Sequence, residues 1–179
     1  MGMACRSRGI TRGTRIFRDR NHVSTIGVIS DTHGLLRPEA IEALRGSDHI
    51  IHAGDVGDPT ILERLRELAP LTAVRGNVDV EAWARKIPET NVLAIQGCTI
   101  YVLHDLGVLD LNPESAGFRA VIYGHSHMPR QEFKKGVLYF NPGSAGPRRF
   151  HLPISVGKVF VERTKLRAEI LELVTAKPA

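Results

Sequence analysis

Short apolar runs alternate with amphipathic segments from residue 23 onward. Residues 23–30, 49–53 and 71–74 are rich in valine, isoleucine and leucine, which predicts buried strands, each followed by a polar loop. Residues 38–45 and 59–68 carry apolar positions at helical spacing, and both begin with a proline, which suits the first turn of a helix. Strand–loop–helix units in series predict a largely parallel arrangement whose strand-end loops open on one edge of the sheet.

The second half of the chain has strand-like runs with little room for helices. Residues 113–117 predict one short helical turn, and Gly136 between two runs predicts a hairpin. The sequence thus predicts an α/β fold, a two-sheet β-sandwich flanked by helices in four layers, α/β/β/α. The runs are 91–95, 99–104, 120–123, 131–135, 137–140, 154–161 and 165–173.

The positive charge of the chain is concentrated at its start. The formal net charge of the 179 residues is +5, and residues 1–20 hold six arginines and one aspartate, which equals this excess. We therefore expect residues 1–22 to be an Arg-rich, flexible extension and residues 23–175 to form one neutral domain. An upstream start, a basic contact arm and an organelle-targeting peptide are the alternatives for the extension.

Composition narrows the class of protein further. No stretch approaches the roughly 18–20 consecutive apolar residues of a membrane helix, so we expect a soluble protein without a membrane partner. The two cysteines, Cys5 and Cys98, cannot build a disulfide framework, and neither belongs to a C-x-x-C pair. This usage predicts a reducing, cytoplasmic compartment and no thiolate zinc site.

Metal-binding side chains directly follow five of the predicted strands. If their segments are extended, residues i and i+2 of D-x-H and H-x-H point to the same side and can hold one ion together. Gly54, Gly76 and Gly124 precede several of these side chains, which suits backbones crowded around a shared centre. The seven candidate ligands are Asp31, His33, Asp55, Asn77, His104, His125 and His127.

The ligand types indicate a pair of divalent cations. Mixed oxygen and imidazole ligands suit Mn²⁺, Fe²⁺, Zn²⁺ or Ni²⁺ rather than Ca²⁺. Seven ligands are too many for one such ion, whereas a bridging carboxylate lets them serve two. Two ions roughly 3.5–4 Å apart generate a hydroxide and stabilise the oxygens of an in-line displacement, which is the chemistry of phosphoester hydrolysis.

The order of these motifs resembles the calcineurin-like metallophosphoesterase superfamily. The segment Asn141-Pro142-Gly143-Ser144 and the compact length resemble its small bacterial and archaeal phosphodiesterases. This resemblance implies a two-sheet sandwich, with catalytic roles for Asp55, Asn77 and His104. It also implies one metal held by Asp31, His33, Asp55 and His127. A second metal would be held by Asp55, Asn77, His104 and His125, with Asp55 bridging.

Several positions depart from the family pattern or extend it. Val78 stands where many members have a histidine that protonates the leaving group, so the usual general acid is absent. Asp105 replaces the usual glycine after His104, and either adds negative charge beside the second metal or faces solvent. Asp79 either orients a metal-bound histidine or caps a loop. Arg148 and Arg149 either clamp a phosphate or form a solvated loop pair.

The expected function is hydrolysis of a small phosphate ester by a hydroxide held between two divalent metals. A diesterase is expected before a monoesterase because of Val78. Mn²⁺ is the cation expected first, with Ni²⁺, Fe²⁺ and Zn²⁺ as alternatives. A homo-oligomer is compatible with the sequence.

Two other functions compete with this one. The scaffold subunit of the retromer sorting complex resembles the same family yet serves as a protein-binding platform. A platform has no need for a full ligand set, whereas this chain keeps all seven. A nuclease that holds nucleic acid with residues 1–20 is disfavoured by the neutral domain and by the lack of an aromatic run. His52, inside a predicted strand, is expected to be a packed core histidine and not a ligand.

Overall fold

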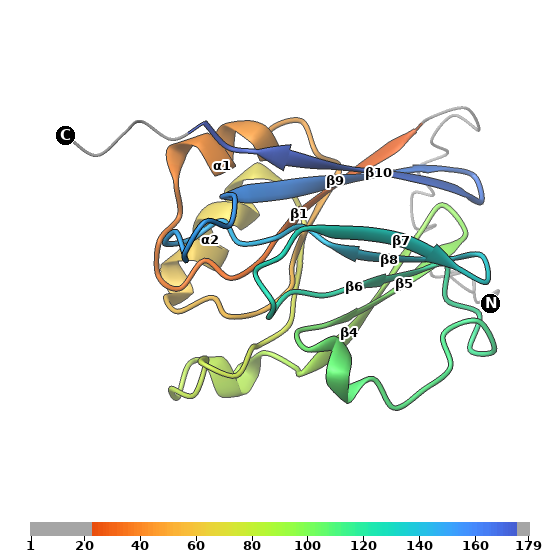
Figure 1. Cartoon of the computed structure of the whole chain (residues 1–179), viewed down its shortest axis with the longest axis horizontal. Coiled ribbons are helices and arrows are strands. Elements are labelled where there is room, and N and C mark those ends of the chain that lie inside the picture. Colours follow the sequence, from red (N-terminus) through yellow and green to blue (C-terminus); the bar gives the residue numbers. More distant parts are fainter. Residues whose placement is uncertain (1–22, 175–179) are drawn as a thin grey trace, which may run out of the picture.

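The computed structural model describes residues 23–174, which fold into two five-stranded sheets packed face to face (Figure 1). The predicted fold class, a two-sheet sandwich with helices outside it, is confirmed. The predicted Arg-rich extension, residues 1–22, lies outside the described residues. None of the helices between residues 23 and 174 is long and apolar enough to cross a bilayer.

The first sheet has the strand order β10-β9-β1-β2-β3. Its three parallel strands are β1 (Ser24–Ile29), β2 (His49–His52) and β3 (Leu71–Ala73), as the strand–loop–helix pattern predicts. The antiparallel strands β9 (Ser155–Glu162) and β10 (Lys165–Glu172) complete this sheet beside β1. The loops that follow β1, β2 and β3 therefore open at one edge.

The second sheet has the order β4-β5-β6-β8-β7. Strands β5, β6 and β8 are parallel, while β4 and β7 are antiparallel to their neighbours. Lys135 and Gly136 join β7 to β8 with positive φ angles of 47° and 78°, the geometry of a tight hairpin turn. The bounds are β4 (Thr90–Ile95), β5 (Cys98–Leu103), β6 (Ala120–Ile122), β7 (Arg130–Lys134) and β8 (Val137–Asn141).

The outer layers differ between the two sheets. Helices α1 (Pro38–Leu44) and α2 (Pro59–Leu68) pack together against the first sheet. Residues 105–118 cover the second sheet with a loop that contains the 3₁₀ helix η2 (Leu106–Val108) and turns at 113–117. A second 3₁₀ helix, η1 (Ala84–Lys86), lies between β3 and β4.

Apolar side chains from both sheets form the central core. Ile26 and Val28 of β1, Ile100 of β5, Ile122 of β6 and Phe140 of β8 belong to one cluster and are fully buried. Burial of each such side chain contributes about 1.5–3 kcal/mol, so this cluster holds the two sheets face to face. The strand ends that carry the polar loops of both sheets are thereby brought together.

A buried hydrogen-bond chain through His52 joins the loops after β1 and β2. The backbone N–H of Gly54 donates to Nδ1 of His52 (3.2 Å), so the ring proton of the neutral imidazole lies on Nε2. Nε2 then donates to the Thr32 hydroxyl (3.0 Å), and that hydroxyl donates to the carbonyl of Val56 (2.9 Å). His52 is fully buried, which confirms the prediction of a packed histidine.

Replacement of Gly157 by alanine should destabilise the sandwich. Gly157 on β9 faces the central core, where a Cβ atom would collide with the Phe140 ring. The collision forces side chains from their preferred positions, at a cost of about 1–3 kcal/mol. Denaturant unfolding of Gly157→Ala measures this loss. Lys158→Ala, at the next position along the strand, is the control, and an equal stability of the two variants would contradict the packing described here.

The stability of the metal-free protein should fall as the pH falls from about 6.5 to 4 because of His52. Burial lowers the pKa of His52 from 6.5 to about 4. Between these values the unfolded chain binds a proton that the native protein does not, so acid favours unfolding. The full difference corresponds to about 3 kcal/mol. Urea unfolding with a chelator present, at several pH values, measures it.

His52→Gln should flatten this pH dependence relative to the wild-type protein, whatever its stability at neutral pH. His151→Gln changes an exposed histidine and serves as the control that keeps the wild-type slope. A wild-type slope in His52→Gln would show that other groups cause the acid sensitivity.

Candidate metal centre

The seven predicted ligand residues meet at the shared edge of the two sheets. The first sheet supplies Asp31 and His33 after β1, Asp55 after β2 and Asn77 after β3, and the second sheet supplies the remaining three from the loops after β5 and β6. The convergence follows from parallel strand ends in two packed sheets. The three residues of the second sheet are His104, His125 and His127.

Asp31, His33 and His127 form a first group whose ligand atoms lie within 4.8 Å of one another. The Nε2 atoms of His33 and His127 are 3.1 Å apart, and Oδ1 of Asp31 lies 3.3 Å from the latter. Oδ2 of Asp31 accepts hydrogen bonds from the Ser30 hydroxyl and the His125 N–H. Oδ1 of Asp31 is buried and has no hydrogen-bond partner among the described residues, which suits a cation ligand.

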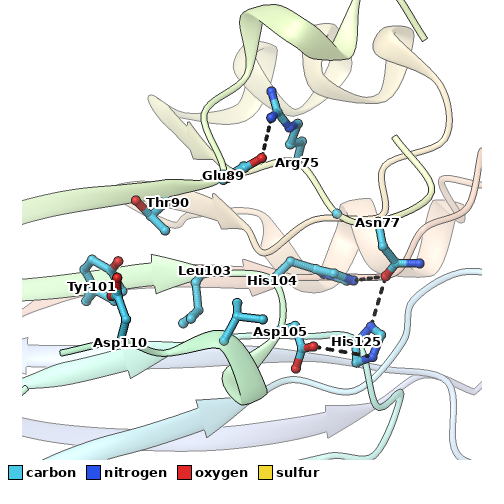
Figure 2. Close-up of a pocket in the computed structure, with 12 residues that line it drawn as sticks. Arg75, Asn77, Glu89, Thr90, Tyr101, Leu103, His104, Asp105, Asp110 and His125 are labelled. Carbon is cyan, nitrogen blue, oxygen red and sulfur yellow. Dashed lines mark hydrogen bonds and ion pairs between the residues drawn. The ribbon is translucent and has the colours of Figure 1, made fainter. Parts of the chain in front are cut away.

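Asp55, Asn77, His104 and His125 form a second group, of which Figure 2 shows Asn77, His104 and His125. Nδ1 of His104 donates to the Ala53 carbonyl (2.8 Å), so the lone pair of a neutral ring lies on Nε2. This Nε2 atom faces Oδ2 of Asp55 at 3.3 Å and Oδ1 of Asn77 at 3.2 Å. Nδ1 of His125 lies 3.0 Å from the same Asn77 oxygen.

The carboxylate of Asp55 lies between the two groups. Its Oδ1 accepts the Val78 N–H (3.0 Å), which leaves Oδ2 to face His104 at 3.3 Å and Nε2 of His33 at 3.9 Å. Asp31 also approaches both groups, because ligand atoms of Asp31, Asp55 and His104 lie within 4.8 Å of one another. Two carboxylates thus occupy the junction at which two cations would share ligands.

The ligand atoms of both groups suit divalent cations. Carboxylate oxygens and imidazole nitrogens lie close together, and the site holds too few N–H and O–H groups to form a hydrogen bond with each of them. Burial raises the pKa of Asp55, but hydrogen bonds from His104 and Val78 outweigh it and lower the pKa overall. Burial lowers the pKa of His104, but its bonds to Asp55 and Ala53 outweigh it and raise the pKa overall. Without a cation, a proton on His104 stabilises the carboxylate, and a cation bound there would replace that proton.

The backbone at the candidate ligands is strained. Asp31, His33, Asp55, His125 and His127 all have positive φ angles, between 46° and 68°. Residues other than glycine rarely adopt this region, and each such position costs about 1–3 kcal/mol. The D-x-H and H-x-H segments are therefore not extended, so the condition under which their spacing alone would put both side chains on one side is not met. The paired side chains converge through tight left-handed turns, and the two histidines of H-x-H belong to different groups.

The glycines beside the ligands are required by close contacts, which confirms the predicted crowding. A Cβ on Gly76 would collide with Oδ1 of Asp55, and a Cβ on Gly124 would collide with the Ser30 hydroxyl. A Cβ on Gly54, which has a φ of 93°, would come within 2.6 Å of His104 Nδ1. The glycines thus let the ligand loops approach one another.

The remaining predicted site residues lie near the centre in different roles. The guanidinium of Arg149 is 3.4 Å from Nε2 of His33, whereas Arg148 is exposed and has no described contact with the ligands. The Asp79 carboxylate accepts backbone N–H groups of Val56, Gly57 and Gly76, so it ties the loops after β2 and β3 together.

Asp105 lines the open side of the second group, and Val78 follows the ligand Asn77 in the chain. Oδ2 of Asp105 is 3.9 Å from Nε2 of His125, and its side chain is 40% exposed. This carboxylate therefore places negative charge beside the second group while it also faces solvent. The Val78 side chain is 43% exposed, and only its backbone N–H contacts a candidate ligand, Asp55.

The Asn-Pro-Gly-Ser segment has a positioning role that its sequence did not reveal. The side-chain amide of Asn141 donates to the Gly124 carbonyl (2.7 Å), and the Ser144 hydroxyl donates to the Asp31 carbonyl (2.9 Å). Both residues are buried. They hold the two strained ligand loops in place, and their position at and just after the end of β8, at the same edge, was the available signal.

Comparisons with known proteins agree with this geometry. Residues 25–164 match the calcineurin-like phosphoesterase superfamily domain. A probable metallophosphoesterase of Methanocaldococcus jannaschii is 37% identical over 157 residues, which cover 83% of this chain and 81% of the relative. A solved structure described as a novel archaeal phosphodiesterase superposes with a TM-score of 0.68 at 27% identity, covering 82% of this chain and 99% of the other.

A more distant solved structure shares the fold. The vacuolar protein sorting 29 structure of Cryptosporidium parvum has a TM-score of 0.67 at 18% identity and covers 86% of this chain and 99% of its own. The match of the family model across most of the described residues, together with the archaeal relative, shows that the chain belongs to the calcineurin-like phosphoesterase superfamily.

Proposed function

We propose that the protein is a metal-dependent phosphodiesterase whose centre holds two divalent cations. The convergence of carboxylate, imidazole and amide ligand atoms in two adjoining groups, with the Asp55 carboxylate between them, carries this proposal. Buried carboxylate oxygens are costly unless they are paired or hold a metal, and Oδ1 of Asp31 has no hydrogen-bond partner among the described residues, which supports a cation at this place. The phosphodiesterase name of a structural neighbour at 27% identity supports the substrate class.

Each group would hold one cation. Asp31, His33 and His127 would hold the first, with Asp55 shared between both. Two divalent cations in such a centre supply a hydroxide nucleophile and stabilise charge on the phosphoryl oxygens. The second cation would be held by Asp55, Asn77, His104 and His125.

The protein's own side chains would orient the ester. Oδ1 of Asn77 faces both histidines, so its amide nitrogen points away from them and can donate to a phosphoryl oxygen (Figure 2). The Arg149 guanidinium beside His33 offers a further charged donor for phosphate. The hydrogen bond from His104 to the Ala53 carbonyl keeps the Nε2 lone pair directed inward.

The leaving group would depart without help from a histidine at position 78. The valine there cannot donate a proton, and general acid catalysis typically contributes about 10²–10⁴ in rate. Esters with good leaving groups are therefore favoured, and diesters are proposed before monoesters. Mn²⁺ is the proposed cation, with Ni²⁺, Fe²⁺ and Zn²⁺ as alternatives, since all accept mixed oxygen and imidazole ligands. The cytoplasmic location stays a prediction.

The scaffold alternative receives no specific support. The likeness to vacuolar protein sorting 29 at 18% identity concerns the fold. The seven ligand-type residues of this chain are all present and in contact, which a binding platform does not require.

Hydrolysis of bis(p-nitrophenyl) phosphate should depend on added metal and on Asp55. Metal-stripped full-length protein is expected to be inactive, and Mn²⁺, Ni²⁺ or Zn²⁺ should restore turnover. Asp55→Asn removes the charge between the two groups and should lower kcat/KM by at least about 10²-fold, since a metal ligand and its charge are lost. Parallel assays with p-nitrophenyl phosphate establish which ester class is preferred.

Asp58→Asn is the matched control, because Asp58 lies in the same loop but caps helix α2. Asparagine is an equally good N-cap, so this variant should keep its activity. Absence of turnover with every metal, in a protein with native unfolding behaviour, would overturn the proposed function.

A further inference from the structure

A cavity of about 570 Å³ opens beside the second group of candidate ligands (Figure 2). Asn77, His104 and His125 form one side of it, and Tyr101 and Asp110 lie on another. The volume falls within the range of about 300–1,000 Å³ that is typical of small-molecule sites. A phosphate held at the candidate metal centre would direct one of its ester substituents into this space.

The charged side chains of the cavity leave a negative excess. Apart from the histidines, the positively charged side chain among the cavity's lining residues is Arg75. Its guanidinium forms an ion pair with Glu89 at 2.5 Å. Asp105 and Asp110 have no lysine or arginine partner among residues 23–174. On the side of Asp110, across the cavity from the candidate metal ligands, this excess would attract a cation of the substrate and repel a second phosphate or a carboxylate.

Tyr101 adds an aromatic ring and an available hydroxyl. Its side chain is only 9% exposed, and one face of the ring packs against Phe118 at a centroid distance of 5.1 Å. No described residue forms a hydrogen bond with the phenol oxygen, which is not buried and is free to contact a bound molecule. The side chain lines the cavity, so both the ring and the hydroxyl are available to a bound molecule.

We propose that this cavity binds the alcohol portion of the ester and selects a positively charged amino alcohol. Asp105 and Asp110 attract the ammonium group, Tyr101 contacts it through the ring or the hydroxyl, and Leu103 and Val108 contact its carbon atoms. A cation over an aromatic ring is attracted by the negative face of the ring. This inference rests on the proposed function, since the phosphate is placed by the candidate metal centre.

The test compares two ligands of the same shape and different charge. Phosphocholine carries a quaternary nitrogen where 3,3-dimethylbutyl phosphate carries a carbon atom. Both ligands are titrated calorimetrically into the Mn²⁺-loaded full chain, and the dissociation constant of 3,3-dimethylbutyl phosphate is divided by that of phosphocholine. Because both ligands carry the same phosphate, its contribution cancels in this ratio. We expect phosphocholine to bind about three- to tenfold more tightly, with a ratio that falls as salt is added.

Removal of the two charges should abolish the preference. In the double variant Asp105→Asn/Asp110→Asn the ratio should approach one. Asp110→Asn alone should lower the ratio while it leaves Asp105, which lies beside the candidate ligand His125, unchanged. Glu63→Gln, an exposed change on α2, is the control that keeps the wild-type ratio. Equal binding of the two ligands, a preference that survives in the double variant, or no binding of either ligand would overturn the inference.

The outcome is separable from that of the proposed function. Turnover of the chromogenic diester without a preference for phosphocholine would refute the cavity's selectivity alone. A clear preference for phosphocholine without turnover of any ester would refute the enzyme and support the cavity as a binding site.

Discussion

Carboxylate and imidazole acceptors face one another at the shared edge of the two sheets, and the protein alone cannot pair them all. Oδ1 of Asp31 has no hydrogen-bond partner among the described residues, and Oδ2 of Asp55 faces the two rings of His33 and His104. Buried acceptors of this kind repel one another unless a proton or a cation lies between them. The fold has to hold these atoms close together against that repulsion, and many of its local features serve this need.

The strained backbone of the ligand loops is the most evident of these features. Left-handed conformations at aspartate and histidine persist only where surrounding contacts determine them. His52 and Thr32 join the first two loops, Asp79 joins the second to the third, and Asn141 fixes the loop of the H-x-H motif. These contacts are buried or partly buried hydrogen bonds, and most bind backbone atoms beside a ligand and not the ligand itself. The stability of the central core thereby supports geometry that the loops would not adopt alone.

The sequence predicted the features that follow from hydrophobic periodicity and from the positions of strand ends, namely the strands themselves and the polar side chains that follow them. Apolar runs placed β1, β2 and β3, and the side chains after them, because a parallel strand must end at the edge where its neighbours end. Gly136 predicted the β7–β8 turn through its conformational freedom. The spacing argument assumed extended backbone at D-x-H and H-x-H, because a positive φ at a histidine leaves no trace in the residue types, whereas the family resemblance already assigned His125 and His127 to different ions. The cavity beside His125 was missed, since Arg75, Tyr101 and Asp110 come from separate segments that only tertiary packing unites.

The most direct test of the centre is anomalous diffraction from crystals of the full chain equilibrated with Mn²⁺. Two peaks per chain should appear, one among Asp31, His33 and His127 and the other among His104, His125 and Asn77, with Asp55 between them. Two peaks at these places would establish the paired cation centre on which the function depends. No peak, or a single peak that leaves one group without a cation at saturating Mn²⁺, would contradict it.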